Sequence, residues 1–248
     1  DVLQSRGLGD VYKRQLDASA LPADHDLSSG DALRHLGLRI GHHTGEVLIT
    51  LVSSSHWSAL ESMAQSWMTR FPQIRGVTLN LQPKRTNLVL GPTTQLLGGE
   101  NSIRERFCDL TLQLATTTFF QINTLQAERV QCIGDWLLSH SPSGRVIDAY
   151  CGIGTISLPL ADRGLRVFGI EINPDSIDQA RMNAARNGLA ERTAFVAGDV
   201  AKLLRAELNA CSALVVDPPR RGLDASVVDA ILEHPPELVA YLSCNVAT

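Results

Sequence analysis

The strongest constraint on the fold of this chain is a regular alternation of short apolar runs and helical patterns in its second half. One intervening helix is well delimited, because Asn173 can cap its start, Pro174 suits its first turn and Gly188 suits its end. This alternation is typical of βαβ units, so we predict a doubly wound, Rossmann-like α/β domain over residues 119–248. Strands are predicted at residues 145–149, 166–170, 194–197, 213–216 and 239–243, and a first helix at 124–139.

Residues 16–118 have a different pattern and predict a smaller α+β domain. A hairpin is predicted across a turn at residues 43–45, followed by a helix from Trp57 to Phe71 with Ser55 as its N-cap. Gly98-Gly99 predicts a turn. Residues 1–15 resemble translated vector sequence, and we expect a non-native or disordered leader there. Further strands are predicted at residues 77–81, 87–90 and 110–114.

Composition narrows the class of protein. The 248-residue chain is 44% hydrophobic, contains no apolar run long enough for a membrane span and opens without a signal peptide. Its five cysteines form no CxxC pair, so neither a zinc site nor a disulfide framework is indicated, and His42-His43 reads as exposed rather than as a metal site. We expect a cytoplasmic monomer without a bound metal. The net charge of -4 gives no sign of a nucleic-acid binder, although a local basic patch is compatible with it, because summed charge does not describe how the charges are distributed.

Ligands of a doubly wound sheet bind beyond the carboxyl ends of its strands. The first predicted strand is followed by the loop Tyr150-Cys151-Gly152-Ile153-Gly154-Thr155. Its two glycines allow the backbone to approach a ligand, although dinucleotide sites share this feature. Ser157 replaces the third glycine of the dinucleotide pattern, which disfavours NAD and favours a cofactor without a pyrophosphate.

Acidic residues follow the next three predicted strands. Glu171 can accept hydrogen bonds from ribose hydroxyls, and Asp199 can face an adenine edge. Asp217 opens the sequence Asp-Pro-Pro-Arg, which is typical of transferases that bring a planar base to a methyl sulfonium. The alternatives are a solvated strand-end charge for Glu171 and an ordinary turn residue for Asp199. Together these features predict an S-adenosylmethionine site.

With these motifs in view, the chain resembles the RNA uracil-5-methyltransferases over roughly residues 30–248. Four segments carry the resemblance: FFQIN at 119–123, YCGIGT at 150–155, DPPR with GLD at 217–224, and SCN at 243–245. It implies S-adenosylmethionine-dependent methylation of uracil carbon 5 in RNA, with 23S rRNA as the first candidate and tRNA as the second. The residues implied to contact the cofactor are Gln121, Tyr150, Gly152, Gly154, Thr155, Glu171, Asp199 and Asp217, and Cys244 is implied to be the nucleophile.

Two departures from the family pattern affect these expectations. Val246 stands where the family usually has proline after Ser-Cys-Asn. The family's general-base glutamate lies further along than residue 248, so we expect a chain truncated at both ends, with an incomplete sheet and incomplete turnover. Neither the β-barrel RNA-binding domain nor the iron–sulfur cysteines of some members are visible in this sequence.

The chemistry explains why a cysteine is needed. Carbon 5 of uracil is a weak nucleophile until a thiolate adds to carbon 6, and a nearby cation such as Arg220 or Arg221 would favour that thiolate. Other readings stay open: an amino-group methyltransferase, which Arg220 in place of an aromatic disfavours, a cytosine-5 methyltransferase, for which no Pro-Cys pair is present, or a catalytically inactive RNA- or cofactor-binding module.

Overall fold

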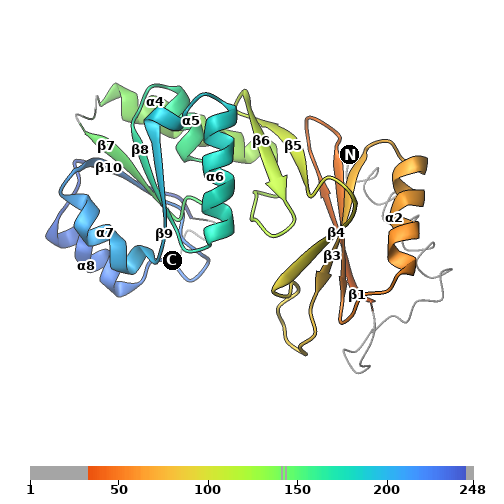
Figure 1. Ribbon diagram of the computed structural model, residues 1–248. Coiled ribbons are helices and arrows are strands. Elements are labelled where there is room, and N and C mark those ends of the chain that lie inside the picture. The colour runs from red at the N-terminus through yellow and green to blue at the C-terminus, as the bar shows by residue number, and fades with distance from the viewer. Residues whose placement is uncertain (1–32, 141, 143, 244–248) are drawn as a thin grey trace. The chain divides into compact units, whose positions relative to one another are not determined.

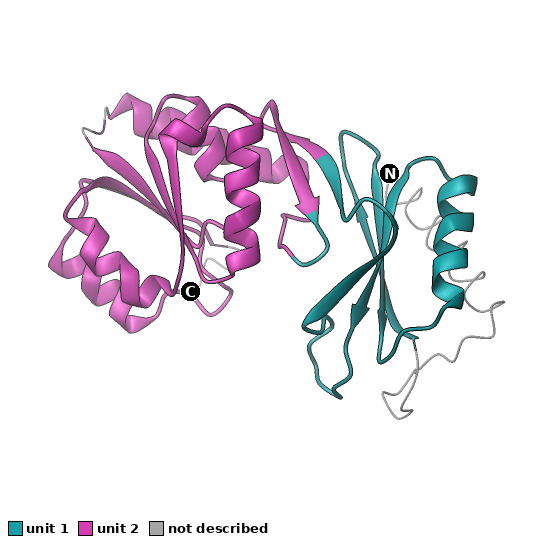
Figure 2. Cartoon of the chain, viewed as in Figure 1, with its two compact units in different colours: residues 1–104, 115–117 teal, residues 105–114, 118–248 magenta. Residues whose placement is uncertain are grey.

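The computed structural model describes residues 33–140, 142 and 144–243. The chain divides into two compact units, coloured separately in Figure 2: unit 1 comprises residues 1–104 and 115–117, and unit 2 comprises residues 105–114 and 118–248. The predicted leader at residues 1–15 lies outside the described residues. Within the described part of the chain, every helix is too short or too polar to cross a membrane.

Unit 1 is a four-stranded sheet with one helix. Its strands β1 (Leu33–Ile40), β2 (Val47–Ser53), β3 (Ile74–Leu81) and β4 (Thr93–Gly99) lie in chain order, and α2 (Ala59–Arg70) connects the parallel pair β2 and β3. The outer pairs are antiparallel. Figure 1 shows α2 on one face of the sheet, where Leu60, Ala64 and Trp67 are buried in a shared core with Ile49 and Leu79.

The predicted hairpin of unit 1 is confirmed, because β1 pairs with β2 and Ile40 lies opposite Val47. The predicted N-cap was wrong, since α2 begins after Ser58 rather than Ser55. The predicted turn at Gly98-Gly99 was also wrong, because both residues belong to β4.

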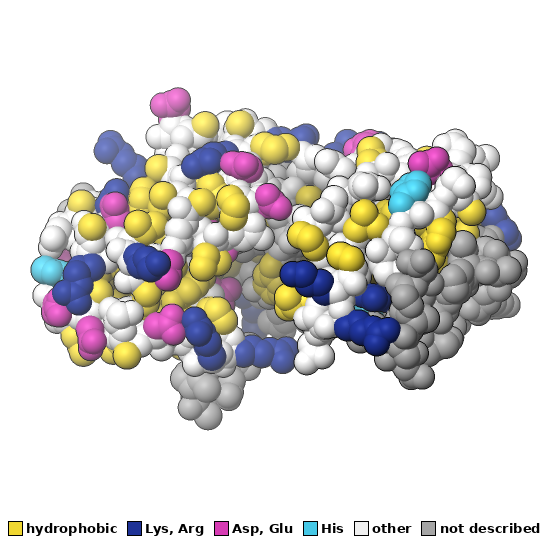
Figure 3. All heavy atoms as spheres, turned by 60° about the horizontal axis from the view of Figure 1, so that its bottom comes forward, with side chains coloured by type: hydrophobic (Ala, Val, Ile, Leu, Met, Phe, Trp, Pro, Cys, Tyr) yellow, Lys and Arg dark blue, Asp and Glu magenta, His cyan; other side chains and the backbone are white. Residues whose placement is uncertain are grey.

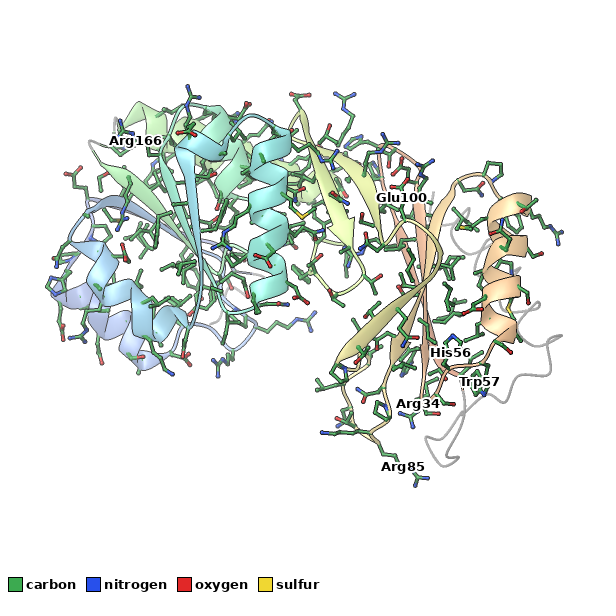
Figure 4. All side chains as sticks on the ribbon, in the orientation of Figure 1. Arg34, His56, Trp57, Arg85, Glu100 and Arg166 are labelled. Carbon is green, nitrogen blue, oxygen red and sulfur yellow. The ribbon has the colours of Figure 1, made fainter. Side chains whose placement is uncertain are left out.

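The predicted strand at residues 87–90 is absent, and side chains explain why. The Gln82 amide donates to the carbonyls of Leu88 and Leu90, while the Asn80 side chain accepts from the Gly91 N–H and donates to its carbonyl. These bonds replace a strand ladder. Arg34 Nη1 donates to the carbonyls of Gln82 and Lys84, and Figure 4 shows Arg34 near the end of the sheet where Arg85 projects.

Unit 2 contains the predicted parallel sheet, with strand order β11-β10-β7-β8-β9. Figure 1 shows α7 and α8 on one face of this sheet, and α5, α6 and the preceding helix α4 (Gln131–Ser139) on the other. The chain moves outward from β7 to β9 and then returns to the other side of β7 with β10 and β11, so the topological switch point lies at β7. The strands are β7 (Arg145–Ala149), β8 (Val167–Glu171), β9 (Thr193–Ala197), β10 (Cys211–Val216) and β11 (Leu238–Tyr241); the helices are α5 (Ser157–Asp162), α6 (Pro174–Arg186), η2 (Ala190–Arg192), α7 (Val200–Leu208) and α8 (Ala225–Glu233).

The start and end predicted for the helix after residue 173 are confirmed in α6. The Asn173 side chain accepts a hydrogen bond from the Asp175 N–H, and Pro174 is the first residue of the helix. Gly188 has a φ of +69°, a left-handed conformation that glycine adopts without a steric penalty.

A hairpin of β5 (Ser102–Phe107) and β6 (Leu110–Ala115) accounts for a difference from the predicted domain boundary at residue 118. Two asparagines of α6 bind the backbone of β6: Asn183 Oδ1 accepts from the Gln113 N–H at 2.7 Å, and Asn187 Oδ1 accepts from the Thr111 N–H at 3.0 Å. Both amides also donate to the carbonyls of the same two residues. Residues 105–114 therefore belong to unit 2.

The helix predicted over residues 124–139 is broken into three pieces. These are α3 (Thr124–Ala127), a 3-10 turn η1 (Glu128–Val130) and α4 (Gln131–Ser139). At the break, Glu128 Oε1 accepts a hydrogen bond from the Cys108 N–H, and Cys108 Sγ donates to the Glu128 carbonyl. These contacts tie η1 to the turn of the β5–β6 hairpin.

Candidate active site

The candidate site lies at the carboxyl edge of the parallel sheet of unit 2, around the switch point at β7. This edge is where ligands of doubly wound sheets bind. The loop after β7 and the first residues after β8, β9 and β10 meet there, because all of these strands run in the same direction.

The loop after β7 has an unusual backbone. Tyr150, Gly152 and Gly154 have φ values of +68°, +54° and +90°, all in regions that side-chain-bearing residues rarely adopt. A Cβ at Gly152 would meet no atom within 4 Å, so open space lies beside this residue. A Cβ at Gly154 would lie 3.0 Å from Leu158 Cγ, so this glycine is required for the close packing of α5. The loop can therefore bring its backbone against a ligand.

Cys151, in the middle of the same loop, is only 2% exposed. Burial, together with the neighbouring carboxyl groups of Asp148 and Glu171, raises the pKa of its thiol well above the usual value. A thiol held in its neutral form is a poor nucleophile, so Cys151 is unsuited to covalent catalysis.

Glu171, the last residue of β8, has both carboxylate oxygens engaged by backbone groups. Oε2 accepts from the Gly152 N–H at 3.2 Å, and Oε1 accepts from the Asn173 N–H at 2.9 Å. The side chain thus links the loop after β7 to the start of α6. Each oxygen keeps a lone pair for a ligand hydroxyl, which leaves the predicted ribose contact chemically available.

Asp199 caps α7, because its Oδ1 accepts a hydrogen bond from the Ala201 N–H at 3.0 Å. This structural role explains an aspartate at this position without any ligand. The side chain is half-buried at the carboxyl end of β9, at the same sheet edge as Glu171.

A pocket of about 370 Å³ brings together three of the predicted site residues: Gln121, Thr155 and Asp217. Gln121 Nε2 lies 3.4 Å from Asp217 Oδ2, within hydrogen-bonding distance across 96 positions of sequence. Burial raises the pKa of Asp217. The other residues that line the pocket are Phe107, Asn123, Gln126, Ala127, Arg129, Val130, Ile133, Ile156, Leu242 and Ser243.

Cys244, the predicted nucleophile, lies outside the described residues. Its neighbour Ser243 lies two residues after the end of β11 and lines the pocket. Strand β11 pairs with β10, as expected for adjacent strands. Of the two arginines considered as activating cations, Arg221 donates to Asp224 at 3.0 Å and Arg220 is exposed. Tyr150, Gly152, Gly154, Glu171 and Asp199 lie at the same sheet edge but do not line this pocket.

Asp148 is a residue at this edge to which the sequence analysis gave no role. It is fully buried in β7, and its Oδ2 accepts a 2.5 Å hydrogen bond from Ser157 Oγ. Its Oδ1 has no hydrogen-bond partner among the described residues. Burial, and to a smaller extent the carboxyl groups of Asp217 and Glu171, raise the pKa of Asp148 to about 7. The available signal was an aspartate inside an otherwise apolar strand, since such residues are seldom buried without a reason.

A second wall of the pocket was also missed. Asn123, Gln126 and Arg129 contribute to it from the start of α3 through η1. Their polar side chains recur at intervals of three residues, which places them on one side of a helical segment. This spacing was the only signal in the sequence.

Comparisons with known proteins agree with this architecture. A family model described as tRNA (Uracil-5-)-methyltransferase matches residues 103–248. An uncharacterized RNA methyltransferase of Parasynechococcus marenigrum (strain WH8102) is 65% identical over 242 residues, which cover 97% of this chain and 52% of that protein. One from Nostoc sp. (strain PCC 7120) is 41% identical over 217 residues, covering 87% and 47%. The chain spans about half the length of the curated relatives it matches.

Among solved structures, the Pyrococcus abyssi tRNA (uracil-54, C5)-methyltransferase in complex with S-adenosyl-L-homocysteine matches with a TM-score of 0.71 and 25% sequence identity. That match covers 86% of this chain and 50% of the other. The M. jannaschii tRNA m1G37 methyltransferase, with a TM-score of 0.52 and 15% identity, covers 92% of this chain and 61% of its own, and shares the fold alone.

Proposed function

The chain belongs to the tRNA (uracil-5-)-methyltransferase family, and from this we propose that the protein containing it transfers a methyl group from S-adenosylmethionine to carbon 5 of uracil in RNA. The strongest support is the pocket in unit 2. It combines Gln121, Thr155 and Asp217 with Ser243, the residue that precedes the proposed nucleophile.

The residues at the sheet edge fit such a cofactor. Open space lies beside Gly152, and Glu171 is held in a fixed orientation beside it by two backbone N–H groups. The carboxyl groups of Glu171 and Asp217 favour a cationic ligand over an anionic one. A pyrophosphate would be repelled by these charges, whereas a sulfonium would be attracted. We propose that Glu171 binds the ribose hydroxyls, Asp199 the adenine edge, and Gln121 and Asp217 the remainder of the molecule.

The proposed chemistry begins at Cys244. Its thiolate adds to carbon 6 of uracil, and the electron pair of the C5–C6 double bond shifts toward carbon 5 and O4, which makes carbon 5 nucleophilic. When bound, the cofactor supplies an electrophilic methyl group. A base then removes the proton from carbon 5, the double bond re-forms, and the Cys244 sulfur leaves as a thiolate. We propose that this base is a carboxylate of the full-length protein.

Two classes of RNA are candidates for the substrate. The family description and the Pyrococcus abyssi enzyme both concern tRNA. The family resemblance of the sequence favours 23S rRNA. We propose an RNA substrate of one of these two classes; comparison of 5-methyluridine in tRNA and 23S rRNA from cells with and without the gene separates them.

A covalent-adduct experiment tests the proposed nucleophile. The full-length protein, incubated with labelled RNA and S-adenosylmethionine, should give an RNA–protein adduct on a denaturing gel, with the label on the peptide that contains Cys244. Cys244→Ala should abolish the adduct. Cys151→Ala should retain it, because the buried Cys151 thiol is held neutral. An adduct on the Cys151 peptide, or sustained turnover by Cys244→Ala, would contradict the assignment.

A further inference from the structure

The pocket of unit 2 contains one positively charged side chain that the proposed chemistry does not use. Among its described lining residues, Asp217 is the only acid and Arg129 the only cation. In the left part of Figure 3, Lys and Arg side chains lie beside acidic ones, and the chain has a net charge of -4. A single well-placed cation can contribute to RNA attraction without a broad positive surface.

The backbone around Arg129 is held by specific contacts. Arg129 is the middle residue of η1, the 3-10 turn that interrupts the predicted helix. The turn is bound on one side by the hydrogen bonds between Glu128 and Cys108. Cys108 and Asp109, with φ values of +50° and +66°, form the tight turn between β5 and β6. A short 3-10 segment within a helix often marks a functional hinge or a strained sequence.

The chemistry of the ligands decides what Arg129 can bind. A uracil base is neutral, and a base that reacts in a pocket must leave its stack while remaining attached to its own phosphodiesters. Those phosphates stay at the mouth of the pocket. Arg129 is exposed to solvent and also lines the pocket, so this residue lies where the pocket opens to solvent. A planar guanidinium matches two phosphate oxygens at once.

We propose that Arg129 binds a backbone phosphate of the RNA strand next to the target uridine, and so positions the strand while Asp217 and Gln121 serve the cofactor side of the pocket. This inference rests on the proposed function. It adds a specific RNA contact that acts through charge and is independent of base identity.

The salt dependence of RNA binding tests this proposal. Binding of a labelled single-stranded oligoribonucleotide containing one uridine is measured with the full-length protein over a series of salt concentrations. Loss of one phosphate contact should reduce the slope of log affinity against log salt by about 0.7. Arg129→Gln should show this reduction and bind RNA about tenfold more weakly at low salt. Its affinity for S-adenosyl-L-homocysteine, measured by calorimetry, should be unchanged, which also shows that the variant folds.

Two further variants act as controls. Arg129→Lys keeps the positive charge and should keep the slope. Arg166, labelled in Figure 4, is another exposed arginine of unit 2 and immediately precedes β8, at the opposite edge of the sheet from the pocket. Arg166→Gln removes the same charge and should also keep the slope.

Several results would overturn the inference. One is an unchanged slope in Arg129→Gln, and another is an equal loss of slope in Arg166→Gln. A third is a loss of S-adenosyl-L-homocysteine affinity in Arg129→Gln without a change in slope, which would assign Arg129 to the cofactor carboxylate. Failure of the unsubstituted protein to bind RNA at all would instead remove the proposed function, and this inference with it.

Discussion

Asp148 places a carboxylic acid inside the parallel sheet, and this has a consequence for stability. Its pKa is raised from the usual 3.8 to about 7, mainly by burial. Between these values the folded protein keeps a proton that the unfolded chain has released. The stabilising contribution of this group is therefore complete below about pH 4 and is lost as the pH rises through about 7.

Asp148→Asn should remove that pH dependence. The asparagine can still accept the hydrogen bond from Ser157 but carries no charge. The free energy of unfolding of the variant, relative to the unsubstituted protein, should rise between pH 4 and pH 7 and level off above it. One pKa unit corresponds to about 1.4 kcal/mol, so the gain should reach a few kcal/mol at most. Urea denaturation of both proteins across this range measures it, and a difference independent of pH would contradict the shifted pKa.

At the scale of elements, the contact between α6 and β6 depends on asparagine side chains. Asn183 is fully buried, accepts from the Gln113 N–H and donates to the Gln113 carbonyl. Asn183→Ala leaves the Gln113 N–H and carbonyl without these partners. Leaving such buried groups unpaired lowers the free energy of unfolding by about 1–3 kcal/mol. Urea denaturation should show this loss, and the Gln113 amide should exchange its hydrogen faster with solvent.

Asn209→Ala is the matched control for this element. Asn209 is exposed at the C-terminal end of α7, and surface substitutions usually change stability by less than about 0.5 kcal/mol. If Asn183→Ala were no more destabilising than Asn209→Ala, the asparagine contacts would not be what assigns residues 105–114 to unit 2.

At the scale of the whole molecule, the proposed cofactor contacts all belong to unit 2. A ligand stabilises the segments whose opening would release it, by about 2.7 kcal/mol when its concentration is 100 times its Kd. S-adenosyl-L-homocysteine should therefore slow hydrogen exchange in peptides that carry Tyr150, Glu171 and Asp217. Peptides from β1 to β4 of unit 1 should change less.

Hydrogen exchange followed by mass spectrometry measures this pattern, and NAD at the same concentration is the control. NAD should give no protection, because Ser157 stands where a dinucleotide site needs its third glycine and the edge carries several carboxyl groups. Equal protection by the two ligands would contradict the cofactor assignment. Protection confined to unit 1 would contradict the assignment of the cofactor site to unit 2.

The sequence alone was sufficient where local chemistry decides the structure. The alternation of apolar runs predicted the parallel sheet, and Asn173, Pro174 and Gly188 predicted the limits of α6. These features depend on hydrogen bonds and backbone conformations within a few residues, so a local pattern carries them.

Only the tertiary structure decided which distant segments meet. Gln121 and Asp217 share a pocket across 96 positions, and residues 87–90 lose their strand because Asn80 and Gln82 hold the segment that contains them. Asn183 assigns the β5–β6 hairpin to unit 2 through bonds that span 70 positions. Side-chain hydrogen bonds of this kind leave no periodic trace in a sequence, because each partner is chosen by packing rather than by its neighbours along the chain.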